Sequence, residues 1–444
     1  MAPQLLQSER KSSGTQRANP DASLSEAPFL IEELFFSRTD ARGIILAANS
    51  VFQRISQFSW DDLLKAPHRL IRHPDIPRGV FHLMWAQIKA GKPIGAYVKN
   101  RAKDGRFYWV FAVVTPIDGG YLSVRLKPTS PLLDVVISEY AVLRRRETQE
   151  RLSPEDSANA LAAMLCERGF ADYAEFMAVA LASETQARET TLAREPIRTR
   201  TALQDIVALA QNSRREVAAM LAIFGDVEIV ASNFRLQSSR HGGTHGPLST
   251  IANNYNVLTS EIRAAIAAFS ANLAAISAAI SNTLFLTDTA AIQTEVADLF
   301  EVEKADLKQI DAEDESRRLD GQRRAYQLAA ARGFCDVFFT AKRLSEGTGH
   351  MHRLVSGLDV ARIMCEIETA QLHGADGSMT DIIADLTRFQ KLLARALNNL
   401  DKLNEALIAD FKSLATLEVT LDPNGPAQSV SDFRGQDAGR IAIR

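Results

Sequence analysis

Two regular seams of large side chains, one on each side of a glycine-rich break, constrain the fold of this chain more than any other feature. The first seam alternates between spacings of four and three residues and consists of Ile206, Ala210, Ser213, Val217, Met220, Phe224, Val227, Ala231 and Phe234. The second seam has the same spacing and consists of Ile262, Ile266, Phe269, Leu273, Ile276 and Ile280. Such spacing is typical of coiled-coil helices, and the glycines and proline of residues 241–247 break any helix between them. The pattern predicts an antiparallel helical hairpin over residues 197–300.

A second copy of this hairpin follows toward the C-terminus. His373 and Gly374 match His241 and Gly242 at a constant offset, and residues 383–384 match residues 251–252 at the same offset. The return seam consists of Leu386, Phe389, Leu393, Ala396, Leu400, Leu403 and Leu407. One hairpin cannot bury both of its apolar faces, so hairpins over residues 197–300 and 301–420 predict a four-helix bundle inside one chain, a pseudo-dimer with both breaks at the same end. The alternative is an ordinary homodimer.

One stretch of the first hairpin has the length of a membrane span. Residues 264–287 carry no charge, and a helix of that length would cross a bilayer. They are mostly alanine, interspersed with serine and asparagine, and alanine and serine contribute little free energy of transfer into lipid. We therefore expect a packed helix here and no membrane span.

Bulk properties limit the class of protein. A chain of 444 residues exceeds one ordinary domain. Its formal net charge of −3, without a basic stripe, argues against a nucleic-acid partner. Cys166, Cys335 and Cys365 lack the spacing of a zinc site or a disulfide framework. Polar residues 1–27 predict a disordered leader, and residues 421–444 a disordered tail. These features together predict a cytoplasmic protein.

Residues 28–128 predict a separate α+β domain. Short strand-like and helix-like runs alternate there, with an amphipathic helix over residues 78–91 and three strands over residues 94–101, 106–115 and 120–127. Two strands, several short helices and three more strands follow the order of a PAS domain, in which helices cross an antiparallel sheet and leave a ligand cavity. Residues 129–196 are rich in helix formers and predict a helical connector.

Within this domain, residues 66–93, "APHRLIRHPDIPRGVFHLMWAQIKAGKP", and residues 98–110, "VKNRAKDGRFYWV", resemble the PAS domain of bacterial aerotaxis receptors. The resemblance covers about a quarter of the chain. It implies that the pocket binds FAD without a covalent bond, and that Arg72, His73 and Asp75 border the cofactor.

Four further residues have side chains that suit a flavin. Asn49 and Asn100 carry amides that can meet the polar edge of an isoalloxazine ring. Trp85 and Trp109 can form an apolar wall, although such rings also stabilise a core without any ligand. The predicted cofactor-binding residues are therefore Asn49, Arg72, His73, Asp75, Trp85, Asn100 and Trp109.

Two alternatives to a flavin remain open from the residues. A PAS domain can hold haem b, with His73 or His82 as the axial ligand, and it can also be a cofactor-free scaffold. We expect no enzyme, because the sequence contains no substrate-binding domain and no constellation of nucleophile and base.

The break of the first hairpin carries a second resemblance. Residues 223–255 are similar to the cytoplasmic tip of methyl-accepting chemotaxis receptors, with Gln237 and Gly243 where that tip has glutamates. This similarity implies partners such as the kinase CheA, the coupling protein CheW or other receptors. The expected function is signal transduction in chemotaxis or aerotaxis: redox state or oxygen is sensed through a PAS-bound flavin and relayed through the helices.

Overall fold

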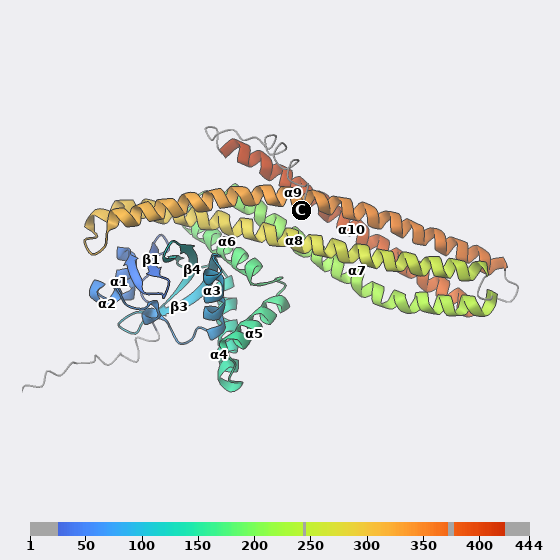
Figure 1. Ribbon diagram of the computed structural model, residues 1–444, viewed down its shortest axis with the longest axis horizontal. Coiled ribbons are helices and arrows are strands. Elements are labelled where there is room, and N and C mark those ends of the chain that lie inside the picture. Colours follow the sequence, from blue (N-terminus) through green and yellow to red (C-terminus); the bar gives the residue numbers. More distant parts are fainter. Residues whose placement is uncertain (1–24, 243–245, 372–376, 422–444) are drawn as a thin grey trace, which may run out of the picture. The chain divides into compact units, whose positions relative to one another are not determined.

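The computed structural model describes residues 25–242, 246–371 and 377–421 (Figure 1). The chain forms two compact units. Of the described residues, the first unit combines those up to Met164 with Ser183–Arg194 and Ala291–Arg324, and the second contains those of Leu165–Ala182, of Glu195–Ala290 and after residue 324. The predicted leader and tail lie outside the described residues, apart from residues 25–27 and 421.

The first unit contains a five-stranded antiparallel sheet in the order β2-β1-β5-β4-β3. The strands are β1 (Leu34–Asp40), β2 (Ile45–Ala48), β3 (Ile94–Arg101), β4 (Phe107–Ile117) and β5 (Gly120–Leu126). The start of β5 lies directly against β1, since a Cβ atom on Gly120 would lie 1.9 Å from the carbonyl oxygen of Thr39. The sheet and its short helices confirm the predicted α+β fold.

Short helical segments cover the inner face of the sheet. They are α1 (Ser50–Ser56), α2 (Trp60–Leu63), the 3₁₀ helix η2 (His68–Ile71) and α3 (Arg78–Lys89). The alternation of side chains along a strand turns Phe35 toward these segments, where it stacks on Phe52 of α1 with ring centroids 5.4 Å apart. The space between the sheet and α3 contains the cavity described below.

The outer face of the sheet is covered by helical segments of the same unit. The helices are α4 (Leu132–Gln149), the last part of α6 (Tyr173–Thr191), and the parts of α8 and α9 that lie between residues 291 and 324. Tyr97 of β3 donates a hydrogen bond to Glu184 of α6 with an O–O distance of 2.6 Å. Phe36 of β1 packs edge-on against Phe300 of α8 at 5.2 Å between ring centroids. The predicted connector thus contains α4, α5 (Pro154–Glu167) and α6.

Four long helices supply most of the second unit, where they form two helical hairpins. They are α7 (Arg198–Gly242), α8 (Pro247–Glu303), α9 (Ala312–Gln371) and α10 (Gly377–Leu421). In the first hairpin Phe234 of α7 meets Tyr255 of α8, with ring centroids 6.3 Å apart. In the second, Arg362 of α9 donates to Gln390 of α10 over 2.7 Å. Both contacts lie near the breaks that the sequence predicted.

The two hairpins pack against each other along their length. Phe224 of α7 packs edge-on against Phe389 of α10 at 5.2 Å between centroids, and a Cβ atom on Gly357 of α9 would lie 3.4 Å from Leu258 of α8. Near the breaks, residues from the start of α8 and the end of α9, including Ile251 and Met364, line one small cavity. These contacts confirm the predicted antiparallel four-helix bundle. The residues of the two breaks, 243–245 and 372–376, lie outside the described part, and homodimerisation stays a prediction.

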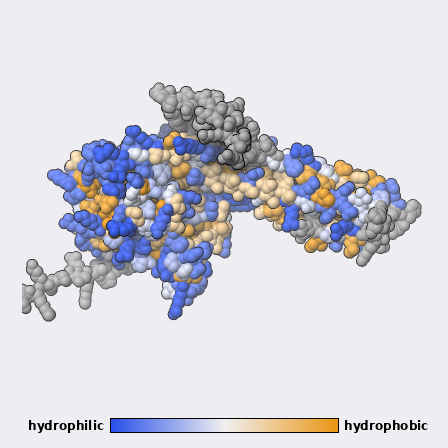
Figure 2. Space-filling view, in the orientation of Figure 1, coloured by the Kyte–Doolittle hydropathy of each residue, from blue (hydrophilic) through white to orange (hydrophobic). Residues whose placement is uncertain are grey.

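Two helical stretches, Arg198–Ser238 and Pro247–Asp306, are long and apolar enough to cross a membrane by length and composition. A core helix of a soluble protein passes the same test. The large residues of the α8 seam, among them Phe269 and Ile276, are at most 2% exposed because they face the bundle core. Hydrophilic residues stand between the hydrophobic ones on the visible face of these helices (Figure 2).

Candidate functional site

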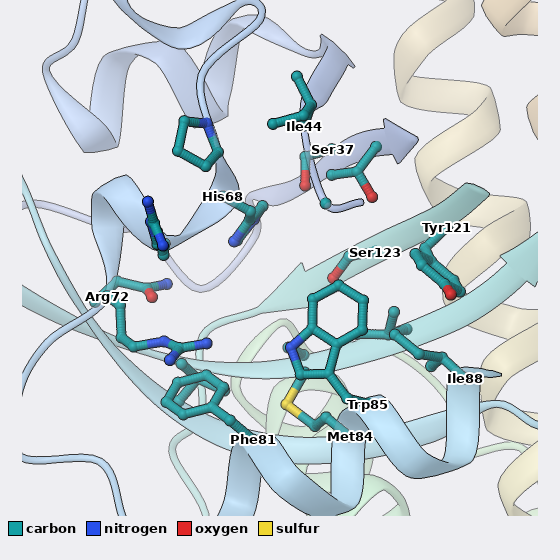
Figure 3. A pocket seen from close by; sticks show the side chains of 18 of the residues that line it. Ser37, Ile44, His68, Arg72, Phe81, Met84, Trp85, Ile88, Tyr121 and Ser123 are labelled. Atoms are coloured by element: carbon teal, nitrogen blue, oxygen red, sulfur yellow. The ribbon is translucent and has the colours of Figure 1, made fainter. Parts of the chain in front are cut away.

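A cavity of about 510 Å³ lies between the inner face of the sheet and the helices η2 and α3 (Figure 3). This volume is within the range of small-molecule and cofactor sites. The cavity is lined by Ser37, Thr39, Arg42, Gly43, Ile44, Pro67, His68, Arg69, Arg72, Phe81, Met84, Trp85, Ile88, Val98, Asn100, Ala112, Val114, Tyr121, Ser123 and Arg125.

One wall of the cavity is apolar and comes from α3. The helix presents Phe81, Met84, Trp85 and Ile88 on the face toward the sheet (Figure 3), as expected from their spacing of three, one and three residues. Trp85 packs edge-on against Tyr121 of β5, with ring centroids 5.7 Å apart. Aromatic and aliphatic side chains of this kind suit a flat ring ligand.

The opposite wall carries two polar atoms that lack partners. Asn100 of β3 is 2% exposed and Ser123 of β5 is 6% exposed. Neither the Asn100 Nδ2 atom nor the Ser123 Oγ atom has a hydrogen-bond partner among the described residues. Buried polar atoms are hydrogen-bonded in the great majority of cases. Two such atoms in one cavity wall therefore indicate a polar ligand that bonds to them.

A buried arginine lies beside these atoms. Arg125 of β5 is 4% exposed, and it donates to Ser37 Oγ at 3.0 Å. Its Nη2 atom lies 2.6 Å from Nε2 of His68. A guanidinium has donors only, so His68 Nε2 must accept this bond. Burial, with the charges of Arg125 and Arg72, lowers the pKa of His68 well below its usual value of 6.5, in agreement with a neutral ring.

Arg72 follows η2 and reaches the same cavity. Its guanidinium carbon lies 3.4 Å from the centroid of the Phe81 ring, and its backbone forms a bridge to Asn100. Burial and the neighbouring charge of Arg69 lower the pKa of Arg72. With Arg42 the cavity has four arginines, and none of its lining residues is acidic. The described lining therefore favours a ligand with negative charge or electron-rich oxygens.

The structure brings three of the seven predicted site residues together in the cavity: Arg72, Trp85 and Asn100. Asn49 has a different role. Its Oδ1 atom accepts the backbone N–H groups of Phe36 and Phe52 at 3.3 and 3.4 Å, and its Nδ2 atom donates to the carbonyl oxygen of Leu34. This side chain caps α1 and does not line the cavity.

The remaining three predicted residues also lie outside the cavity lining. Asp75 is largely exposed and accepts a hydrogen bond from Lys99 Nζ at 2.6 Å. His73 Nδ1 lies 3.4 Å from the Asp75 carboxylate. Trp109 pairs with Lys99 in the β3–β4 register, and this register turns its ring to the outer face, 6.4 Å from Tyr140 of α4. None of these three residues is among those that line the cavity.

Sequence reasoning missed His68, Ser37, Ser123 and Arg125. A signal was present in β5, where Tyr121, Ser123 and Arg125 alternate with Leu122, Val124 and Leu126. Such alternation marks one apolar and one polar face of a strand. Since both faces of this sheet are covered, the polar face had to line a site.

Neither histidine that was predicted as an axial haem ligand lines the cavity. His82 is exposed on α3, and His73 is paired with Asp75. Across the described ranges no cluster of histidine, cysteine and acidic residues has the arrangement of a metal site.

Comparisons with known proteins agree with the fold. Residues 45–124 match the family model described as the PAS fold. The aerotaxis receptor of Escherichia coli (strain K12) is 33% identical over 140 residues, which cover 30% of this chain and 28% of that protein. A nitrogen fixation regulatory protein of Klebsiella pneumoniae is 35% identical over 81 residues, 18% of this chain and 16% of that protein. The chain thus spans less than a third of the length of these relatives.

Solved structures include two similar domains. The light state of the blue-light photoreceptor Aureochrome1 LOV is 24% identical, with a TM-score of 0.21 over 23% of this chain and 88% of that one. The PAS domain of a protein from Colwellia psychrerythraea is 20% identical, with a TM-score of 0.19 over 22% of this chain and 86% of that one. On the family match and the sequence identity, the N-terminal unit of this chain carries a PAS sensor domain homologous to that of the aerotaxis receptor.

Proposed function

We propose that this chain is a signal-transduction protein that senses redox state or oxygen through FAD bound in the PAS cavity and relays the signal through its helices. The observation that carries the proposal is the pair of unpartnered buried atoms, Asn100 Nδ2 and Ser123 Oγ, facing an aromatic wall. A flavin supplies a flat ring with a polar edge, whose charge and protonation change with its oxidation state.

The residues of the cavity suit the parts of such a cofactor. Trp85 and Phe81 would pack against the ring, while Asn100 and Ser123 would bond its polar edge. Arg72, nearer the surface, would bind a phosphate or an oxygen of the flexible chain through two donors. The same residues would respond to a change in the oxidation state of the ring. When a ring atom changes from hydrogen-bond acceptor to donor, the side chains bonded to it must rearrange.

One path for the signal leads through α3. The backbone N–H of Arg78, at the start of α3, donates to Glu147 of α4 at 2.6 Å. The next N–H, of Gly79, donates to Ser157 Oγ of α5 at 3.1 Å, and Ser157 in turn donates to Glu147 at 2.6 Å. The first turn of the helix that walls the cavity is therefore held by side chains of α4 and α5. A shift of α3 would move this joint.

A second path leads through the sheet. Glu184 of α6 accepts hydrogen bonds from Tyr97 and from the backbone N–H groups of Thr129 and Ser130, just after β5. Arg188 of α6 pairs with Glu295 of α8 at 2.6 Å. Helix α8 is unbroken from Pro247 to Glu303. A change in β5 would thus reach a helix that continues into the four-helix bundle.

The proposal makes the helical bundle the output element. We propose a cytoplasmic protein without enzymatic turnover that acts in chemotaxis or aerotaxis, with CheA, CheW or other receptors as the partners to test. The support is the homology of the PAS domain to the aerotaxis receptor together with the four-helix bundle that follows it.

The absorption spectrum of the purified full-length chain tests the cofactor. Two bands in the near-ultraviolet and blue would support flavin, an intense Soret band would establish haem, and a chain that neither contains nor takes up flavin would refute the proposal.

Replacing Arg72 should reduce the retention of FAD. Hydrogen bonds to charged groups contribute about 1.5–3 kcal/mol, so Arg72→Ala should weaken FAD binding roughly 10- to 150-fold. Asp75→Ala is the matched control, because Asp75 lies three residues away but outside the cavity lining. Flavin content after gel filtration and the Kd of added FAD are the measurements. Equal values for parent and Arg72→Ala would contradict the assignment.

A further inference from the structure

We propose that Arg125 is the anion-recognition residue of the PAS cavity: its guanidinium binds a negatively charged or electron-rich oxygen of the ligand. This inference rests on the proposed function and deepens it, since it predicts that the protein stabilises the reduced, more electron-rich state of the flavin over the oxidised one.

Arg125 is a buried cation. Its side chain lies in the wall of the cavity and is 4% exposed. Burial lowers the pKa of its guanidinium to about 10, which leaves the group charged near neutral pH. A buried charge is costly unless it is paired.

The partners of Arg125 are all neutral. They are the hydroxyl of Ser37 at 3.0 Å, the ring nitrogen of His68 at 2.6 Å, and the faces of the Phe35 and Phe52 rings at 5.4 and 5.7 Å. No carboxylate pairs with Arg125 within the described ranges. The phenyl rings of Phe35 and Phe52 carry no net charge, so they cannot supply a countercharge. A ligand in the cavity can.

His68 acts as a positioning residue for this group. Its backbone N–H donates to the carbonyl oxygen of Gly43 at 2.8 Å, and its ring is parallel to that of Phe52 at 6.2 Å between centroids. The ring is thereby fixed with Nε2 toward the guanidinium. Because the cationic neighbours keep the ring neutral, His68 orients Arg125 without adding a second charge at the same place.

Two neighbours complete the site. Ser123 is two residues before Arg125 on β5, and its free hydroxyl lies on the same face of the strand. Arg42 also lines the cavity, but its side chain is 84% exposed and pairs with Asp40 at 3.1 Å. Arg69 and Arg72 are exposed, so among the four described cavity arginines only Arg125 is both buried and without an acidic partner. A negative charge on a ligand is therefore stabilised most strongly beside Arg125.

The experiment compares Arg125→Met with Arg101→Met in the full chain, because Arg101 is exposed at the end of β3 and is not among the residues that line the cavity. Methionine keeps much of the length of the side chain and removes its charge. In the flavin-loaded protein we expect Arg125→Met to reduce the preference for the reduced form at least tenfold, which is about 30 mV for a two-electron couple. Arg101→Met should leave the midpoint potential unchanged. An unchanged potential in Arg125→Met would overturn the inference while leaving the proposed function in place.

A second measurement does not depend on flavin. In the cofactor-free chain, inorganic phosphate at constant ionic strength should raise the melting temperature of the parent and of Arg101→Met, but not of Arg125→Met. An equal rise in all three would overturn the inference. If the parent takes up no flavin, the proposed function fails. The phosphate measurement then tests by itself whether Arg125 binds an anion. If Arg125→Met does not fold, Arg125→Gln, which keeps donors to Ser37 and His68, replaces it in both measurements.

Discussion

The close packing of α3 on α5 can be tested by adding one methyl group at Gly79. A Cβ atom on Gly79 would lie 2.6 Å from both the backbone nitrogen of Ala158 and the carbonyl carbon of Ser157. Ordinary contacts need about 3.4 Å or more, so Gly79→Ala must displace α3 and α5 by most of an ångström, and backbone atoms cannot rotate away. Overpacking of this kind costs about 1–3 kcal/mol. We expect Gly79→Ala to lower the unfolding free energy of the first unit by that amount.

Gly321→Ala is the matched control. Gly321 is also helical and belongs to the same unit, but a Cβ atom there meets nothing within 4 Å. The helix propensity of alanine should therefore raise stability by up to about 1 kcal/mol. Urea unfolding followed by circular dichroism gives both values, and hydrogen exchange of residues 154–167 should increase only in Gly79→Ala. Two variants of equal stability, with unchanged exchange, would refute the close packing of α3 on α5.

Two further predictions concern buried charges. The folded pKa of His68 lies below 6.5, so the unfolded state binds a proton more readily than the folded state. The unfolding free energy of the flavin-free chain should therefore fall as the pH drops below about 6.5, by at most about 1.4 kcal/mol per pH unit. His68→Gln should reduce this slope in urea titrations, and an unchanged slope would speak against a neutral buried ring. In the second unit the side chains of Arg200 and Asp288 are 2% and 0% exposed and form an ion pair. Asp288→Ala should therefore destabilise the bundle by about 3–5 kcal/mol, while the double variant Arg200→Met with Asp288→Leu should be close to neutral. Thermal unfolding compares the two, and an equal loss of stability in both would contradict the pairing.

The sequence by itself determined the architecture, because the signals for it are local. The seams of α7, α8 and α10 and the glycine-rich breaks predicted the hairpins, since a helix repeats its faces every few residues wherever it lies. The order of strands and helices, with the segment around Arg72, predicted the PAS domain in the same way. The motifs did not fix which of their side chains point inward: Arg72 lines the cavity, while His73 and Asp75 of the same segment do not.

Tertiary structure alone decided which side chains meet. Lys99 and Trp109 are paired across β3 and β4 and face outward, while Asn100, one residue further, faces the cavity. A shift of one residue in register would exchange these faces. Arg125 and His68 are 57 residues apart in the chain, and no periodicity of either segment specifies their contact. The pairing depends on the folding of η2 over β5, which brings a donor-only cation and a neutral acceptor together in a cavity without an acid among its described lining residues.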